Sequence, residues 1–418
     1  MQGGTRMLLP KPRTLAETGL SRELLFRLIL RHLQEEGSLS LPILSDRLCL
    51  RGSIIEPLLQ ELKTLQLVEV RASGRMDEPI RYALTNKGQY EAQEVSARDG
   101  YIGPAPIPLA DYNKLVLAQS LGERSIRRER LLVALDNMVI SQDLINTLGP
   151  ALNSRRPLLI YGHAGTGKSF LCHRFNRIFD EHIYVPHAIA VQNTIIPVFD
   201  PLYHWRVDEH DEKDRDGRYI PCTRPLVMVG GELKLDMLEV HFDRQSRQYS
   251  PPLQLKANNG VFLIDDLGRQ GFAADELFNR WIVPMEERRD FLSLPNGLHF
   301  DIPFEQILVF STNLDPETIA DEAFLRRLGY KIHLQAMPVE LYKQVWNMNL
   351  EKYQLVATEP LFRFMVEELH ENSAKPLIAC YPRDILGIAR DIMHFNGQAG
   401  QPLSEEILRK AWNMYCVH

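Results

Sequence analysis

The eight residues from Gly162 to Ser169 constrain this chain more than any other part of its sequence. They read Gly-His-Ala-Gly-Thr-Gly-Lys-Ser, which fits the phosphate-binding pattern of four free positions between Gly and Gly-Lys-Ser. An apolar run, Leu158 to Tyr161, precedes them, and a helical pattern from Phe170 to Phe175 follows. A Gly-rich turn is the alternative interpretation, but strand, loop and helix in this order are the context that the motif requires. The segment therefore predicts a site for a nucleoside triphosphate.

Each part of this loop has an expected task. Glycine permits the backbone to curl so that N–H groups face an anion, and the start of the following helix adds the positive end of its dipole. The Lys168 ammonium is expected at the β- and γ-phosphates, and the Ser169 hydroxyl on Mg²⁺. Nucleotide contacts are expected from the loop and the residue after it: Gly162, His163, Ala164, Gly165, Thr166, Gly167, Lys168, Ser169 and Phe170.

Polar side chains follow two further apolar runs. Val261 to Ile264 ends in Asp265 and Asp266, and the run ending at Phe310 is followed closely by Asn313. The first carboxylate is expected beside Mg²⁺ and the second beside the water that attacks the γ-phosphate, with the Asn amide orienting that water. An acidic turn and a turn-forming Asn are the alternatives when each is taken alone. Their position downstream of the phosphate loop favours a catalytic role.

Three arginines complete the candidate site. Arg326 and Arg327 lie in Phe-Leu-Arg-Arg, and Arg383 lies in Tyr-Pro-Arg-Asp at the start of a helical pattern. Guanidinium groups form paired hydrogen bonds that suit phosphate recognition, although most surface arginines have no specific partner. Arg383 is expected to reach the nucleotide from a separate C-terminal lid.

Apolar strand candidates alternate with helical patterns through this part of the chain. Leu158 to Tyr161, Val261 to Ile264 and Ile307 to Phe310 are the strands, and the chain reads helical from about Pro338 to its end. This alternation predicts an α/β fold with a parallel sheet that has helices on both faces, followed by a helical lid.

These elements, in this order, resemble the AAA+ class of P-loop ATPases from about Leu131 onward. The resemblance implies that Gly162 to Ser169 is Walker A, that Asp265 and Asp266 are Walker B, and that Asn313 is sensor 1. It also implies that Arg326 or Arg327 is the arginine finger, that Arg383 is sensor 2, and that Val139 and Ile140 pack near the adenine. The family usually has Asp-Glu at Walker B, so the shorter Asp266 implies slower turnover with binding retained.

An arginine finger acts on a nucleotide held by a neighbouring subunit. The resemblance therefore implies ATP and Mg²⁺ as ligands and a homo-oligomer, most simply a hexameric ring.

The sequence also predicts a β-hairpin, which resembles one found in some groups of this class. A helical run ending in Pro284 to Arg288 precedes two strand-like runs, Asp290 to Leu294 and Leu298 to Ile302, which flank Asn-Gly. This pattern resembles the hairpin inserted before sensor 1 in MoxR-like proteins and neighbouring groups. Gly230 to Leu233 is a weaker candidate for the start of their second insert.

The N-terminal region has a different pattern. Helices are expected over Ser21 to Glu36, Leu41 to Leu48 and Ser53 to Leu65, the last with Ser53 as N-cap. Two strands, Val68 to Arg71 and Ile80 to Leu84, flank a polar turn. Three helices followed by a hairpin resemble a winged-helix domain.

Composition shifts suggest the domain limits. Gly103, Pro104, Pro106 and Pro108 favour an extended connector. The expected division is a winged helix over 1–98, a linker over 99–125, an α/β core over 126–336 and a lid over 337–418. The charged stretch from Asp208 to Arg218 mixes both signs and is expected to be a solvated loop.

Charge and cysteine content limit the partners. The net charge of −6 gives no general attraction to nucleic acid, and the third helix of the winged-helix region carries Glu56 and Glu61 against Lys63. Five scattered cysteines without a Cys-x-x-Cys pair indicate neither a disulfide framework nor a zinc site. With no long apolar run and no signal-peptide pattern, we expect a cytoplasmic protein without a membrane span.

Three functions fit these observations. The first is an ATP-hydrolysing ring that remodels or assembles a protein complex, in the manner of a MoxR-like chaperone with an unknown protein client. The second is a DNA-associated ATPase or regulator that binds nucleic acid through the winged helix. The third is a nucleotide-gated scaffold with negligible turnover, which the short Asp266 side chain motivates.

Overall fold

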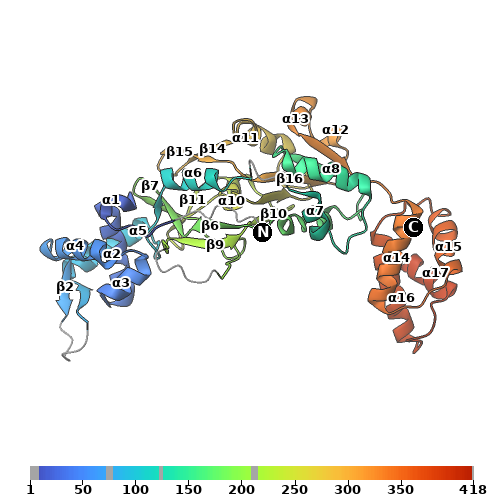
Figure 1. The fold of residues 1–418 in the computed structure, drawn as a ribbon, viewed down its shortest axis with the longest axis horizontal. Coiled ribbons are helices and arrows are strands. Elements are labelled where there is room, and N and C mark those ends of the chain that lie inside the picture. The colour runs from blue at the N-terminus through green and yellow to red at the C-terminus, as the bar shows by residue number, and fades with distance from the viewer. Residues whose placement is uncertain (1–8, 72–78, 122–125, 209–214, 417–418) are drawn as a thin grey trace.

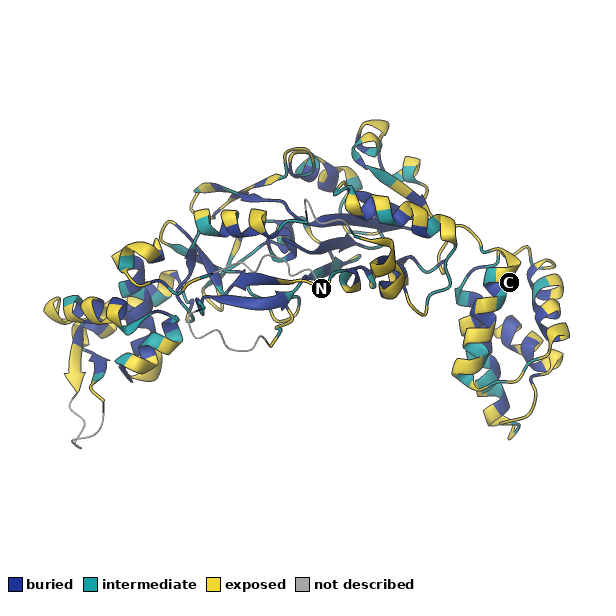
Figure 2. Ribbon diagram, viewed as in Figure 1, coloured by how far each residue is buried: buried dark blue, intermediate teal, exposed yellow. Residues whose placement is uncertain are grey.

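The computed structural model describes residues 9–71, 79–121, 126–208 and 215–416. The molecule is elongated, with a central α/β layer between an N-terminal helical unit at one end and a C-terminal helical unit at the other (Figure 1). Figure 2 shows that the strands of the central layer are buried and that the outer helices expose one face.

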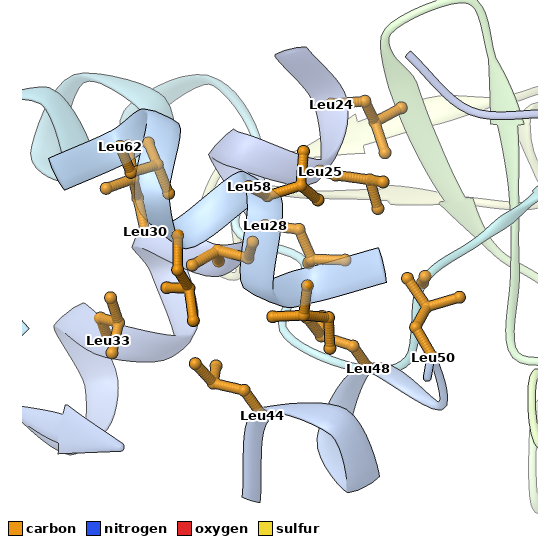
Figure 3. Close-up of a cluster of buried hydrophobic side chains, with 14 of the residues drawn as sticks. Leu24, Leu25, Leu28, Leu30, Leu33, Leu44, Leu48, Leu50, Leu58 and Leu62 are labelled. Carbon is orange, nitrogen blue, oxygen red and sulfur yellow. The ribbon is translucent and has the colours of Figure 1, made fainter. Parts of the chain in front are cut away.

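Three helices and a small sheet form the N-terminal unit. The helices are α2 (Arg22–Glu36), α3 (Leu41–Leu48) and α4 (Gly52–Thr64), after a short α1 (Leu15–Thr18). The antiparallel sheet has the order β1-β3-β2, formed by β1 (Ser38–Ser40), β3 (Arg81–Leu84) and β2 (Val68–Arg71). The predicted helices and strands are all present, and leucines from the three helices interlock in their core (Figure 3). The polar turn between β2 and β3 falls mainly on 72–78, outside the described residues.

Two local predictions for this unit differ in outcome. The Ser21 hydroxyl accepts a hydrogen bond from Leu24 N and caps α2, and Gly37, with φ of 75°, ends it. The prediction that Ser53 is the N-cap of α4 is wrong, because the helix begins at Gly52 after Arg51. β1 was not predicted, since three residues are too short to show a periodicity. The unit closes with α5 (Asn86–Arg98), whose N-cap is Thr85.

The prediction of a linker over 99–125 that is extended and not packed is wrong for the packing of its described part, because this segment contains regular elements with buried side chains. It contains β4 (Ile107–Pro108) and α6 (Leu109–Ala118). The buried Arg31 guanidinium pairs with Asp99 and donates to the carbonyls of Asp99 and Tyr101, at 2.9 and 2.8 Å. The prolines keep the backbone extended, as expected, but the side chains between them are buried. Residues 122–125 lie outside the described part.

A β region that the sequence did not reveal, antiparallel except for its β4–β7 pair, follows this segment. It comprises β6 (His182–Pro186) paired with β9 (Tyr219–Thr223), and β7 (Ala188–Val191) paired with β8 (Thr194–Pro197) and with β4. Its apolar side chains share one core with α6 and with the later hairpin β14–β15.

The expectation of a solvated loop over Asp208 to Arg218 is wrong at its C-terminal end. Asp216 and Arg218 are buried and joined at 2.8 Å, and the Arg218 guanidinium also donates to the carbonyls of Thr18 and Pro106. A buried pair of opposite charges that also satisfies backbone carbonyls is tolerated where single charges are not. Residues 209–214 of the stretch lie outside the described part.

Five parallel strands form the central sheet in the order β10-β13-β16-β5-β17. They are β5 (Leu158–Tyr161), β10 (Leu226–Val229), β13 (Val261–Ile264), β16 (Ile307–Thr312) and β17 (Tyr330–His333). The three predicted strands are confirmed. Helices cover both faces: α7 (Arg128–Ala134), α8 (Gln142–Asn153) and α9 (Lys168–Cys172) on one, and α10 (Leu253–Ala257), α11 (Ala274–Glu287) and α13 (Glu322–Arg327) on the other. The predicted α/β fold class is confirmed.

Two hairpins are inserted between the elements of this layer. The predicted one consists of β14 (Arg289–Ser293) and β15 (His299–Pro303), paired antiparallel. Gly297, with φ of 84°, donates to the Leu294 carbonyl and ends its three-residue turn. The second hairpin follows Gly230 to Leu233 after a 3-10 turn (Leu235–Leu238) and is formed by β11 (His241–Asp243) and β12 (Gln248–Ser250).

The C-terminal unit is helical, as predicted. It contains α14 (Val339–Tyr353), α15 (Glu359–Arg363) continued by a π-helical segment (Phe364–His370), α16 (Cys380–Phe395) and α17 (Glu405–Tyr415). Trp346, Trp412 and Tyr342 are buried in its core. Within the described residues, none of the helices has the length and apolar character needed to cross a membrane. All five cysteines are free thiols.

Candidate nucleotide site

The loop between β5 and α9 adopts a backbone that favours glycine. Gly162, Gly165 and Gly167 have φ values of 142°, 86° and 97°. A Cβ atom on Gly162 would lie 2.3 Å from the Leu334 carbonyl oxygen, and one on Gly165 would lie 2.4 Å from Cys380 Sγ. Gly162 and Gly165 are therefore needed both for backbone conformation and for close packing, against the residue after β17 and against α16, whereas Gly167 is needed for conformation alone.

Lys168 is the first residue of α9 and is buried, with 5% of its surface exposed. Its Nζ donates to the carbonyls of Gly162 and His163, at 2.8 and 2.9 Å, so the ammonium lies across the mouth of the loop. Burial lowers the pKa of Lys168, and the charges of Asp265 and Asp266 oppose that shift. An anion entering the loop would replace the two carbonyls as the partner of this charge.

The helix after the loop is shorter than predicted. α9 ends at Cys172, and the chain continues through a 3-10 segment (Phe175–Ile178) instead of a helix that runs on to Phe175. Phe170 is half exposed in the wall of the cavity described below, with the Arg174 guanidinium 5.0 Å from its ring centroid.

Ser169 and Asp265 meet where β13 ends. Ser169 Oγ donates to Asp265 Oδ2 at 2.6 Å. A hydroxyl and a carboxylate at this separation present oxygen ligands only, the set that Mg²⁺ prefers, and Mg²⁺ commonly takes one or two protein oxygens together with phosphates and water. The donor chemistry of this pair therefore fits the metal ion implied by the sequence. Among the described residues there is no cluster of three His, Cys, Asp or Glu side chains for a metal held by protein alone.

Asp266 and Asn313 meet one strand further along. Asn313 Nδ2, just beyond β16, donates to Asp266 Oδ1 at 2.8 Å. Asp266 has φ of 50°, unusual for a residue other than glycine, and its N–H donates to Asp265 Oδ1 at 3.0 Å. The parallel order of β5, β13 and β16 brings these carboxyl-end residues to one edge of the sheet, the usual place for ligands in such folds.

A cavity of about 1090 Å³ lies at this edge. The phosphate loop from Ala164 to Phe170, Asp266 and Asn313 form one side of it. Val139 and Ile140, predicted near the base, lie in its wall within the run 137–141. Gly162, His163 and Asp265 do not line the cavity themselves. They form hydrogen bonds with two residues that do, Lys168 and Ser169.

Much of the remaining wall was missed by sequence reasoning. It comes from the end of β17 and the following residues 334–338, and from one face of α14, including Leu341, Met348 and Asn349. The apolar spacing of α14 predicts a helix but does not tell which of its faces covers the core and which faces a ligand. Cys380 N donates to the Gly165 carbonyl at 3.2 Å, so α16 rests directly on the phosphate loop.

Arg383 lies in the first turn of α16 and lines the cavity. Its guanidinium forms two hydrogen bonds with the adjacent Asp384, at 2.6 and 3.1 Å. The side chain is close to the predicted position for reaching a nucleotide from the C-terminal unit, although it is paired with a carboxylate here.

Arg326 and Arg327 are not brought to this cavity. Both lie at the end of α13, where Arg326 pairs with Glu322 and Arg327 with Glu286, each at 2.6 Å. The Arg326 side chain is 75% exposed. Within one chain, therefore, the structure unites the phosphate loop, both carboxylates, Asn313 and Arg383, and it leaves the arginine pair on the outer surface.

Comparison with known proteins yields distant similarities. A model for a domain of unknown function, DUF8689, matches residues 338–414, the C-terminal helices. No curated protein matches the chain.

Among solved structures, the chain is similar to NtrX from Brucella abortus, with 10% identity and a TM-score of 0.43 over 66% of this chain and 57% of NtrX. It therefore spans little more than half of that protein. NtrX in complex with ADP gives 10% identity and a TM-score of 0.42, over 67% of this chain and 56% of that one. The RuvB Holliday junction branch migration motor of Thermotoga maritima gives 13% and 0.38, over 66% and 70%. These similarities are too distant to place the chain in a family, and the functional assignment rests on the geometry of its own site.

Proposed function

We propose that this protein is an ATP-hydrolysing P-loop enzyme of the AAA+ class. One observation carries the proposal: Lys168, the Ser169–Asp265 pair and the Asp266–Asn313 pair converge at the carboxyl edge of one parallel sheet, beside a cavity large enough for a nucleotide. The first pair joins α9 to the end of β13 and the second joins the ends of β13 and β16, so the three sets offer groups for phosphate binding, metal binding and water activation.

The residues have separate tasks in this proposal. Backbone N–H groups of the loop and the Lys168 ammonium bind the β- and γ-phosphates, and Val139 and Ile140 contact the base. Ser169 and Asp265 would hold Mg²⁺, which when bound neutralises charge on the phosphate oxygens. Arg383 lines the same space and would exchange its Asp384 partner for a phosphate.

Asp266 and Asn313 act on the attacking water. The Asp266 carboxylate accepts a proton or hydrogen bond from that water, and the Asn313 amide holds the carboxylate through one oxygen, which leaves the other free to face the cavity. Because Asp is one methylene shorter than Glu, we expect turnover to be slow, whereas nucleotide binding does not depend on this side chain.

The exposed arginines on α13 support an oligomer. Arg326 and Arg327 cannot serve the cavity of their own chain from the positions described above, but an outward guanidinium suits a site that a neighbouring subunit carries. We propose a head-to-tail homo-oligomeric ring, most simply a hexamer, in which each site is completed by the next subunit.

The biological role that we propose is the remodelling or assembly of a protein complex, as in MoxR-like ATPases. Two hairpins, β14–β15 and β11–β12, are candidate contacts for a client through the faces that they do not pack against the rest of the chain. The N-terminal unit has the helix and strand order of a winged helix. Glu56 and Glu61 on α4, the latter paired with Arg22, disfavour a DNA backbone and favour protein docking.

The test is phosphate release by the assembled full-length protein with ATP and Mg²⁺. Wild type should release phosphate, and Lys168→Ala should lower both nucleotide binding and release by at least about 100-fold, since a buried cation at the phosphates is lost. Lys87→Ala, a change of an exposed lysine in the N-terminal unit, is the matched control and should leave both unchanged. Wild-type protein that binds nucleotide but releases no phosphate would point to the scaffold function instead.

A further inference from the structure

Gln270 lies in the short loop between β13 and α11, four residues beyond Asp266, and its side chain is half-buried. Its Nε2 lies 3.2 Å from the Gly230 carbonyl oxygen and 3.3 Å from those of Asp265 and Asp266. Its Oε1 accepts a hydrogen bond from Gly268 N at 2.9 Å. One amide therefore connects both Walker B candidates with the loop that follows β10.

The surroundings fix the orientation of this amide. Carbonyl oxygens only accept hydrogen bonds and a backbone N–H only donates, so the NH₂ group must face the three carbonyls and the oxygen must face Gly268. The opposite orientation would place four oxygens together. A glutamate at this position has nearly the same size and shape, but it would also place an oxygen against the three carbonyl oxygens.

The conformation of Asp266 requires such a support. A φ of 50° costs free energy for any residue that has a Cβ atom, and a backbone strained in this way persists only where its neighbours hold it. Asp265 Oδ1 holds the Asp266 N–H, and Asn313 holds the side chain. The Asp266 carbonyl accepts from Arg269 N at 3.0 Å, and Gln270 Nε2 is a second donor to it and also a donor to the Asp265 carbonyl.

The loop after β10, which Gln270 also contacts, is itself held by hydrogen bonds. Gly230 N donates to Glu232 Oε1 at 2.9 Å, and Asp265 N donates to the Val229 carbonyl at 2.7 Å, which continues the β10–β13 pairing. The contact between Gln270 and the Gly230 carbonyl therefore ties the Asp266 turn to the neighbouring strand. Gln270 itself is not among the residues that line the cavity.

We propose that Gln270 is a positioning residue for hydrolysis, which holds Asp266 in the conformation that presents its carboxylate to the attacking water. The inference rests on the proposed ATPase function and deepens it. Because Gln270 acts on Asp266 and not on the nucleotide, its loss lowers kcat and leaves nucleotide affinity unchanged.

The test compares Gln270→Met and Gln270→Glu in the full-length protein. Methionine keeps the length of the side chain and removes its hydrogen bonds, whereas glutamate keeps the shape and reverses the donor. We expect both to lower kcat at least about tenfold, with KM and the dissociation constant for ATP within about twofold of wild type. Gln60→Met, the same change at an exposed position of α4, should leave kcat unchanged.

Each outcome has a distinct meaning. Unchanged kcat in Gln270→Met, with an active wild type, overturns the inference and leaves the proposed function intact. A parallel loss of kcat, nucleotide affinity and melting temperature shows a structural role only and also overturns it. Wild-type protein without phosphate release overturns the proposed function itself, and the inference with it.

Discussion

The carboxylate of Asp266 has one oxygen held by Asn313, at 2.8 Å, and in the proposed function this arrangement would separate hydrolysis from nucleotide binding at a single residue. Asp265, which precedes it, accepts a hydrogen bond from Ser169, with which it would hold Mg²⁺ in the proposed function. Two adjacent carboxylates thus face different partners because the chain turns sharply between them, with φ of 50° at Asp266. Substitutions at the two positions should therefore have different kinetic effects.

Asp266→Asn should lower kcat by about 100-fold and leave nucleotide affinity within about twofold, because the amide retains the shape and the bond to Asn313 but cannot accept a proton. Steady-state phosphate release and equilibrium nucleotide binding measure the two quantities. Asp275→Asn, at an exposed position in the first turn of α11, is the control. Weakened binding that accounts for the whole loss of rate would contradict the assigned role.

At the residue scale, the sequence predicted which polar side chains lie close together, and their roles stay predictions. The phosphate loop, the carboxylates after β13 and Asn313 could be predicted because parallel strands end at one edge of a sheet. Gln270 could not be found in this way, since the role proposed for it depends on three backbone carbonyls, and every residue type has such a group. The nucleotide-facing side of α14 depends on how the lid rests on the loop, which its own pattern does not encode.

At the scale of elements, α13 carries its two arginines on the outside of the chain, and the hypothesis of a shared site can be tested by mixing. Asp266→Asn lacks the carboxylate, and the Arg326→Ala/Arg327→Ala double variant lacks the fingers. A site in a mixed ring is complete when the double variant supplies the carboxylate and the Asp266→Asn subunit supplies the arginines. An equal mixture should recover about one quarter of wild-type phosphate release, although each variant alone is inactive.

Random exchange of subunits is the condition for this result, and it can be verified with differently tagged wild-type chains. Glu340→Ala, at the exposed start of α14, serves as a control substitution. An active Arg326→Ala/Arg327→Ala variant would show that α13 has no role in hydrolysis. A mixture that stays inactive after subunit exchange would exclude sharing of the site between chains.

The core of the C-terminal helical unit contains a titratable residue, His370. His370 Nδ1 lies 3.0 Å from the Lys375 carbonyl, which only accepts, so this nitrogen carries the proton and Nε2 accepts from the Tyr342 hydroxyl at 2.6 Å. Burial lowers the pKa of His370 from 6.5 to about 4. The folded lid therefore holds a neutral imidazole at a pH where the unfolded chain binds a proton.

Stability should accordingly fall as the pH drops below about 6.5, and this loss should level off near pH 4, where the folded protein also binds the proton. Between pH 7 and 5 the contribution of His370 is on the order of 2 kcal/mol. Denaturant unfolding of wild type and His370→Gln at these two pH values measures it. The variant should be less stable at pH 7 but should lose less stability on acidification; equal losses in both proteins would contradict the assignment.

Several elements could not be predicted because their partners are distant in sequence. The strands between Glu181 and Thr223 pair with one another and with the segment at Ile107 to form a separate core, and their short apolar runs lack a clear period. The prolines at 104–108 indicate an extended backbone but not burial. The sequence around Arg218 does not distinguish a buried arginine from a solvated one. Its burial depends on its partner Asp216 and on the surrounding carbonyls, which only the structure shows.

At the scale of the whole molecule, the charge distribution argues against a nucleic-acid machine. The full-length protein should not shift the mobility of duplex DNA at physiological salt, and DNA should not stimulate its ATPase activity, because the chain is acidic and α4 offers few cations to phosphates. A gel-shift titration at two salt concentrations measures binding. A shift that weakens as salt rises would favour the DNA-associated alternative.

The buried arginines near the N-terminal unit have a consequence for how the molecule transmits motion. Arg31 joins this unit to the segment after α5, and Arg218 binds the carbonyls of Thr18 and Pro106, so polar contacts as well as apolar packing attach the unit to the β region. A module held in this way does not search for partners on a flexible tether. In the proposed ring, the N-terminal units would therefore be held at fixed distances from one another. A partner that binds several of them at once would need binding sites at the same distances.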